Sequence, residues 1–298
     1  MAKRFWIEYI IDYSPFRPIV TCFLIGISHS IILWLMALFT ENMFNRVLND
    51  LGQYFIDASF MLIIYAMYRF ILSYRESIDE LIDMFPEERN TLISMRSLVN
   101  SKYNYLIGVL GTLFAHYLAW FKQPHISIFG FKEPIYTNGP VLGMIYHSVQ
   151  VAIFVFIFYT IYFFIASNTF FFNLLTIFFF FRLRNIISLY NIFHPKIKLL
   201  VNRFHNVILY SILMPTSGII LTPVVLYRFQ YFHSLIFLLG YFIYLGYVGL
   251  IVIACFSGLY LWLLGARDRV LDTLRSQYSW IIDELSSGKE ELDETLYR

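Results

Sequence analysis

The stretch from residue 182 to residue 205 combines positive charge with aromatic side chains and contains no acid. This combination is typical of an anion site, because cations neutralise phosphates while aromatic rings stack on bases. Two alternatives stay open: contact with anionic lipid headgroups, and pairing with the acidic stretches at 74–103 and in the C-terminal tail. The candidate anion-binding residues are Arg182, Arg184, Lys196, Lys198, Arg203, His194 and His205.

His29 is the second candidate, because it is an ionisable side chain in the middle of an apolar run. An ionisable residue inside a membrane is a functional hypothesis by default. His116, His147 and His233 fall nearer the predicted outer membrane face, where interfacial hydrogen bonding is the simpler interpretation. No histidine has a second one three or four residues on, and Asp57 lies at the edge of its apolar run. We therefore expect no metal ion and no cofactor.

A third candidate is the apolar run at 206–227, which two prolines eight residues apart interrupt, with Thr, Ser and Gly between them. Irregular backbone at membrane depth survives only inside a helix bundle or beside a water-filled path. This segment is expected to line a pore or a cavity, or simply to kink. Glycines in the following run let helices approach closely. The pore-lining candidates are Thr216, Ser217, Thr222, Pro215, Pro223, Gly246 and Gly249.

Motifs of known enzymes are absent from the sequence. It contains no H-E-x-x-H, no G-x-S-x-G, no Walker A loop and no paired D-x-x-D motif. Cys22 and Cys255 lie apart in apolar runs and are expected to be small buried side chains. We therefore expect no enzyme, and a lipid-modifying enzyme that uses the histidines is the weakest of the hypotheses below.

Composition places these candidates in a membrane protein. The chain has 298 residues, of which 59% are hydrophobic and 14% charged, whereas soluble domains have about 25% charged residues. From Gly143 to Phe181 no residue is charged, and a spanning helix needs only about 20 apolar residues. The run either folds back at 167–169 and crosses twice, or crosses once and continues as a buried helix. The predicted class is an all-α polytopic membrane protein.

Charge decides between these topologies. With one crossing there are six transmembrane helices, both termini are cytoplasmic, and 18 of the 22 Lys and Arg residues fall inside. With two crossings only nine of the 22 do. Cytoplasmic loops are rich in Lys and Arg, so six spans are predicted. The apolar residues near 170–181 must then be covered by neighbouring helices or subunits, which indicates a homo-oligomer.

The predicted organisation has seven parts, and cytoplasmic helical segments extend the transmembrane helices. The parts are an interfacial amphipathic helix (1–18), transmembrane helices 1 and 2 (19–73), a charged cytoplasmic helical segment (74–103), transmembrane helices 3 and 4 with a long fourth helix (104–181), a basic cytoplasmic segment (182–205), transmembrane helices 5 and 6 (206–264), and a cytoplasmic C-terminal helix with an acidic tail (265–298).

This layout is loosely similar to that of insect odorant and gustatory receptor channels. The span count and the acidic tail differ from theirs, so no residue and no function is transferred. The leading hypothesis is an oligomeric ion channel or pore-forming effector, gated by its cytoplasmic helices through an anionic ligand of the nucleotide or oligonucleotide type, as in bacterial antiviral defence. The second is a non-conducting membrane sensor that signals through its C-terminal helix to a soluble partner protein. The lipid bilayer is the expected surrounding, in a bacterial inner (plasma) membrane.

Overall fold

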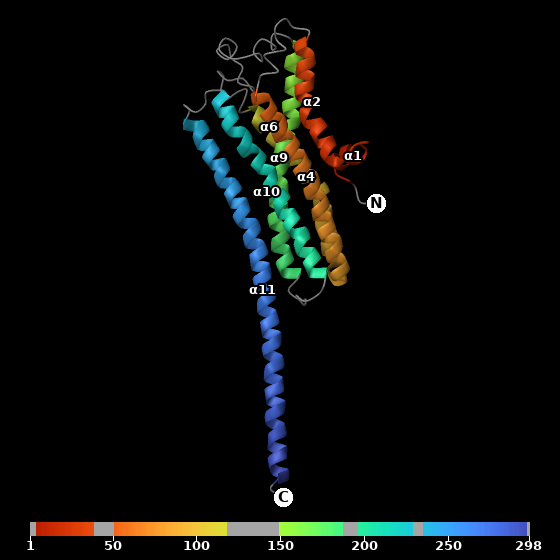
Figure 1. The fold of residues 1–298 in the computed structure, drawn as a ribbon, viewed down its shortest axis with the longest axis vertical. Helices are drawn as coiled ribbons and strands as arrows, with labels where there is room; N and C mark the ends of the chain where they lie inside the picture. Colours follow the sequence, from red (N-terminus) through yellow and green to blue (C-terminus); the bar gives the residue numbers. More distant parts are fainter. Residues whose placement is uncertain (1–3, 39–50, 118–148, 187–195, 229–234, 297–298) are drawn as a thin grey trace.

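The computed structural model describes residues 4–38, 51–117, 149–186, 196–228 and 235–296. These residues are almost entirely helical and include no strand (Figure 1). The helices are α1 (Trp6–Asp12), α2 (Pro18–Leu38), α4 (Leu51–Met84), η1 (Pro86–Glu88), α5 (Arg89–Ser97), η2 (Leu98–Asn100), α6 (Lys102–Tyr117), α9 (Val149–Ile186), α10 (Lys196–Arg228) and α11 (Leu235–Leu296).

The long apolar run forms one helix. Helix α9 continues through residues 167–169 without a break, and its 38 residues include no glycine and no proline. Thr169 turns its hydroxyl back onto the carbonyl oxygen of Ala166, so this polar residue is satisfied within the helix. The fold-back at 167–169 is therefore wrong, and the continuous helix is the correct alternative.

Within the described residues, three helices are long and apolar enough to cross a membrane. They include the segments Tyr54–Met84 of α4, Phe156–Leu183 of α9 and Tyr241–Asp283 of α11. A shorter apolar segment, Pro18–Ile32, lies in α2. The chain thus has the character of a helical membrane protein, and the count of six spans with cytoplasmic termini stays a prediction.

Several predicted boundaries between spans and charged segments lie inside single helices. Helix α4 runs through the boundary at 73–74 and ends at Met84, because Phe85 precedes Pro86 and takes a non-helical conformation (φ −128°, ψ 69°). Helix α10 begins at Lys196, inside the predicted basic segment, and continues through Pro215 and Pro223. Helix α11 includes the last apolar run and the acidic stretch in 62 continuous residues.

Helices α4, α9 and α10 form the centre of the bundle, with α2 against α4, α6 against α9, and α11 against α9 and α10 (Figure 1). Helices α6 and α9 approach each other closely at Gly111 of α6. A Cβ atom there would lie 2.2 Å from Ser167 Oγ, so a glycine lets α6 and α9 pack. Gly246 and Gly249 of α11 differ, because a Cβ atom on either would meet nothing within 4 Å.

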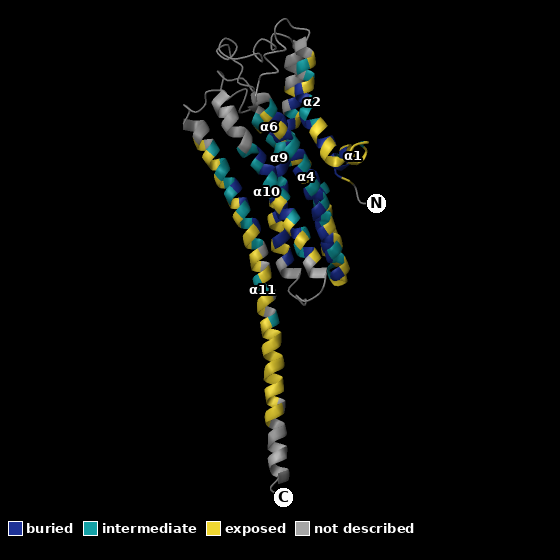
Figure 2. Ribbon diagram, in the orientation of Figure 1, coloured by how far each residue is buried: buried dark blue, intermediate teal, exposed yellow. Residues whose placement is uncertain are grey.

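Exposure is uneven along the bundle. Of the apolar residues near 170–181 that were expected to be covered, Phe172, Phe179 and Phe180 are buried against neighbouring helices. Leu174 and Phe181 are 46% and 67% exposed. Within this single chain, the prediction of burial is therefore correct for only one of the two faces of α9. The C-terminal part of α11 projects beyond the other helices, and its residues 271–283 are all exposed (Figure 2).

Candidate functional site

Polar side chains from five helices are buried or half-buried along the inside of the bundle. We refer to them together as the polar interior. Its members are His29 of α2, Asp57 and Ser59 of α4, Tyr162, Thr169, Asn173 and Thr176 of α9, Ser211 and Ser217 of α10, and Tyr244 and Tyr247 of α11.

At one end of the polar interior, His29 faces Asp57. The distance from His29 Nδ1 to Asp57 Oδ1 is 3.3 Å, and the two residues are 1% and 6% exposed. The imidazole also stacks on the ring of Phe158, with 3.8 Å between ring centroids. The packing of α2 on α4 therefore gives His29 a carboxylate partner, which the sequence analysis did not expect.

Next to this pair, hydroxyl groups link α4, α9, α10 and α11. Ser59 Oγ lies 3.2 Å from the hydroxyl of Tyr162 and donates to the carbonyl oxygen of Ser217 at 3.3 Å. Tyr244 of α11 donates to the carbonyl oxygen of Pro215. Side chains from neighbouring helices thus donate to backbone carbonyls of α10 at and just after Pro215.

The same level of the bundle contains a cavity of about 200 Å³. A water molecule occupies about 30 Å³ in the liquid, so the cavity has room for several. Its wall carries hydroxyl groups from three helices among apolar side chains. The lining residues are Ile63, Tyr162, Ala166, Thr169, Phe170, Met214, Ser217, Gly218, Tyr244 and Tyr247.

Asn173 connects α9, α10 and α11 further along the polar interior. Its amide oxygen accepts a hydrogen bond from Ser211 Oγ at 2.8 Å, and its Nδ2 donates to the hydroxyl of Tyr247 at 3.1 Å. Thr176 Oγ1 donates to Ser211 Oγ at 3.1 Å. Tyr247 also lines the cavity. The cavity and this cluster therefore form one continuous set of polar groups.

Toward the far end of α4, charged side chains join α4 to α10. Arg69 Nε donates to the hydroxyl of Tyr210 at 3.2 Å. Arg203 forms ion pairs with Glu76 and with Glu80, the latter at 3.4 Å. This contact confirms, for Arg203, the alternative in which the basic segment pairs with the acidic stretch at 74–103.

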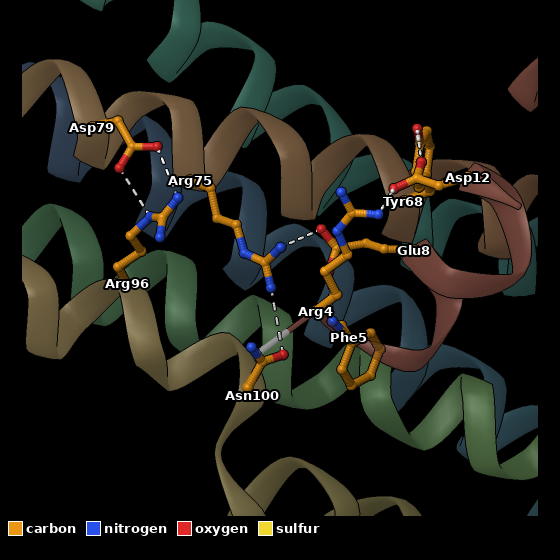
Figure 3. A network of polar contacts seen from close by, with 9 residues as sticks. All are labelled: Arg4, Phe5, Glu8, Asp12, Tyr68, Arg75, Asp79, Arg96 and Asn100. Atoms are coloured by element: carbon orange, nitrogen blue, oxygen red, sulfur yellow. Dashed lines mark hydrogen bonds and ion pairs between the residues drawn. The ribbon is translucent and has the colours of Figure 1, made fainter. Parts of the chain in front are cut away.

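A second charged cluster attaches the N-terminal helix to α4 (Figure 3). Glu8 is 3% exposed, accepts a hydrogen bond from the Phe5 backbone N–H, and forms an ion pair with Arg75. Arg75 also donates to Asn100 Oδ1 at 3.4 Å. Burial raises the pKa of Glu8 above its usual value, although the hydrogen bond from Phe5 and the charge of Arg75 oppose the shift. The predicted interfacial helix therefore contacts α4 through a buried ion pair as well as through apolar side chains.

The predicted pore-lining residues divide into three groups. Ser217 is buried and lines the cavity, while Thr216 donates to its own helix at the carbonyl oxygen of Ile212. Gly246 and Gly249 face away from the neighbouring helices of the chain. Pro215 is buried in α10, and the side chains of Thr222 and Pro223 lie outside those that the structure describes.

Three of the predicted anion-binding residues have described side chains. Arg203 is half-buried and paired with carboxylates, whereas Arg182 and His205 are exposed. The guanidinium of Arg182 lies 5.6 Å from the ring centroid of Phe178. The anion site stays a prediction. The remaining candidates lie outside the described side chains, namely His194, Arg184, Lys196 and Lys198.

Sequence reasoning missed Asp57, Asn173 and the tyrosines that line the cavity. Asn173 had a usable signal, because an amide in a phenylalanine-rich run is expensive in lipid and is expected to face the protein interior. Chemically, the polar interior offers hydroxyl and amide groups that replace water around a small polar solute or ion. Comparison with family models, curated proteins and solved structures finds no match for this chain.

Proposed function

We propose that the protein is the subunit of an oligomeric ion channel, with its permeation path along the polar interior between α4, α9, α10 and α11. The observation that carries the proposal is the hydroxyl-lined cavity of about 200 Å³ that continues into the Asn173 cluster. The pore-lining residues predicted from the sequence lie on α10 and α11 alone, whereas the proposed path is also lined by α4 and α9.

Physical chemistry supports this path. A hydroxyl or amide moved from water into an apolar surrounding without a partner costs roughly 1–3 kcal/mol. Polar groups buried in charge-poor membrane helices therefore mark substrate and ion pathways. A hydroxyl-lined cavity at this depth gives a partly dehydrated ion replacement ligands, as the lining of a selective pore does.

The described conformation corresponds to a closed state in this proposal. Phe60 packs between Phe158 and Tyr162, with ring centroids 5.2 and 5.7 Å away, between the His29 pair and the cavity. The ion pairs of Arg203 with α4 hold the other end of α10. An anionic ligand of the nucleotide type that competes for Arg203 would release α10 and open the path.

The setting of the channel is part of the proposal. A membrane location agrees with the three long apolar helices. Six spans, cytoplasmic termini, a bacterial inner membrane and a role in antiviral defence remain predictions from the sequence.

Ion flux into liposomes containing the purified protein tests the path. Thr169→Val removes a cavity hydroxyl at nearly constant volume, and a lost hydrogen bond of about 1 kcal/mol lowers flux roughly fivefold. The matched control is Thr160→Val on the same helix. Thr160 also donates to a carbonyl oxygen of its own helix, that of Phe156, but does not line the cavity. Equal flux in these two variants contradicts the proposed path.

A second pair of variants tests obstruction. Ser217→Leu fills the cavity and is expected to abolish flux, whereas Ser257→Leu on an exposed position of α11 leaves flux unchanged. Retained helicity and detergent mass in Ser217→Leu separate obstruction from misfolding. If both variants conduct like the wild type, ions do not pass through the cavity.

The exposed end of α11 favours the second candidate, a sensor that does not conduct. In that case the wild type supports no flux, and a soluble protein is recovered on the C-terminal helix in a one-to-one complex. Flux without such a partner rejects the sensor.

A further inference from the structure

The C-terminal part of α11, residues 265–296, extends beyond the rest of the bundle, and we name it the tail helix (Figures 1 and 2). Large apolar side chains project from it although none of the described helices covers them. Those on one face are Leu271, Leu274, Tyr278, Ile281 and Leu285, which are 41%, 46%, 68%, 45% and 66% exposed.

The spacing of these five residues is regular. They follow one another at intervals of three, four, three and four residues, the alternation of the a and d positions in a heptad repeat. A repeat of 3.5 residues per turn, slightly less than the 3.6 of a straight helix, is the pattern of helices that wind around each other. The pattern therefore favours a helical partner that runs alongside the tail helix.

Lipid does not fit this seam. Charged residues recur on successive turns from Arg267 to Arg275 and again at 283–284, and those whose side chains are described are exposed, namely Arg267, Asp268, Asp272, Arg275 and Asp283. Charged side chains on successive turns exclude the segment from the hydrocarbon core. The seam is thus an apolar surface in water, and such a surface marks an interaction site.

We infer that the occupant of this seam is the tail helix of further copies of the same chain, in a parallel coiled coil. Subunits inserted in a membrane in one orientation carry their tail helices on one side, in the same direction and at the same height. Each a and d residue then meets its own copy, so the seam is complementary to itself. In the sequence Glu284 occupies a g position and Lys289 the next e position, which a parallel register brings together with opposite charges.

The inference gives the proposed oligomeric channel its interface outside the membrane, and it rests on that proposal only for the presence of several copies. Val270 at a g position and Ile282 at an e position widen the apolar stripe beyond the a and d residues. The stripe then suits more than two strands, as a pore-forming assembly needs.

Disulfide cross-linking of the full chain in membranes tests the register. In a background with Cys22→Ala and Cys255→Ala, Leu274→Cys at a d position is expected to cross-link subunits at least about tenfold more than Ser276→Cys. Ser276 is the matched control, because it lies on the same turn at an outward f position and is exposed. Equal cross-linking at the two positions overturns the inference.

Mass in detergent provides the second measurement. Leu274→Asp combined with Ile281→Asp is expected to lower the mass of the assembly, whereas Ser276→Asp combined with Ser279→Asp at outward positions leaves it unchanged. If the mass of the assembly is unchanged in the seam variant, the inference is wrong. It is also wrong if the tail helix binds only the membrane or a different protein. Cross-linking without flux would keep the tail interface and reject the channel, and flux without cross-linking would do the reverse.

Discussion

The pair of His29 and Asp57 can be tested by a double-mutant cycle. Both residues are almost fully buried, and their facing atoms are 3.3 Å apart. His29→Leu leaves the carboxyl group of Asp57 without this partner, which costs about 3–5 kcal/mol for a buried pair. Asp57→Leu removes the carboxylate from the buried imidazole and costs about 1–3 kcal/mol.

The double variant is expected to behave differently from the sum of its parts. Replacing both members of a buried pair with apolar residues of similar size is often neutral, so His29→Leu combined with Asp57→Leu should lie within about 1 kcal/mol of the wild type. The resulting coupling is at least about 3 kcal/mol.

The assay is the free energy of unfolding from denaturant titration of the protein in detergent, followed by circular dichroism. Contacting residues depart from additivity, while independent ones add to within about 0.5 kcal/mol. Single effects that simply sum would therefore refute the pairing of these two side chains. The double variant is also the informative one for flux, because it is expected to fold and yet lacks the polar end of the path.

Three further perturbations follow from the packing. Gly111→Ala should lower the free energy of unfolding by about 1–3 kcal/mol, because the added Cβ has no room. Gly246→Ala, at a position that faces open space, should be neutral or slightly stabilising. Thermal unfolding of both variants measures the difference. Ile11→Ala in the docked N-terminal helix should cost about 2–5 kcal/mol and Ile10→Ala, which is 48% exposed, under about 1 kcal/mol in denaturant titration. The docked state raises the pKa of Glu8, so docking of the N-terminal helix should be strongest below the usual glutamate pKa and should weaken as pH rises through the raised pKa. Amide hydrogen exchange at residues 5–12 measures this docking. Docking that weakens on acidification would contradict the predicted direction.

Much of the helical architecture could be predicted because it depends on local patterns. Hydropathy alone identified α9, and the distribution of Lys and Arg favoured a single crossing over the fold-back, in agreement with the continuous helix. Helix ends were less predictable. Nothing local stops α4 at its first charged residues, since Glu76, Asp79 and Glu80 lie on a helix whose other face buries Ile78 and Leu81.

The polar interior was only partly predictable, because it depends on contacts between distant residues. Ser217 was identified from the prolines beside it, but its hydrogen-bond partner Ser59 lies 158 positions away. In the sequence Asp57 lies at the edge of its apolar run, which gives no sign of a role in the interior. Only the packing of α2 on α4 brings His29 next to it. Gly246 and Gly249 carried a small-residue signal without indicating which face of α11 they occupy.

The central claim is that ions pass through the cavity between α4, α9, α10 and α11. The most direct measurement is the current through single channels in a planar bilayer, using Ser217→Cys in a background with Cys22→Ala and Cys255→Ala. The account predicts current steps that fall or vanish when a small cationic thiol reagent modifies the new cysteine, because Ser217 lines the cavity. Steps that continue unchanged after complete modification, or a folded protein that gives no steps, would contradict it.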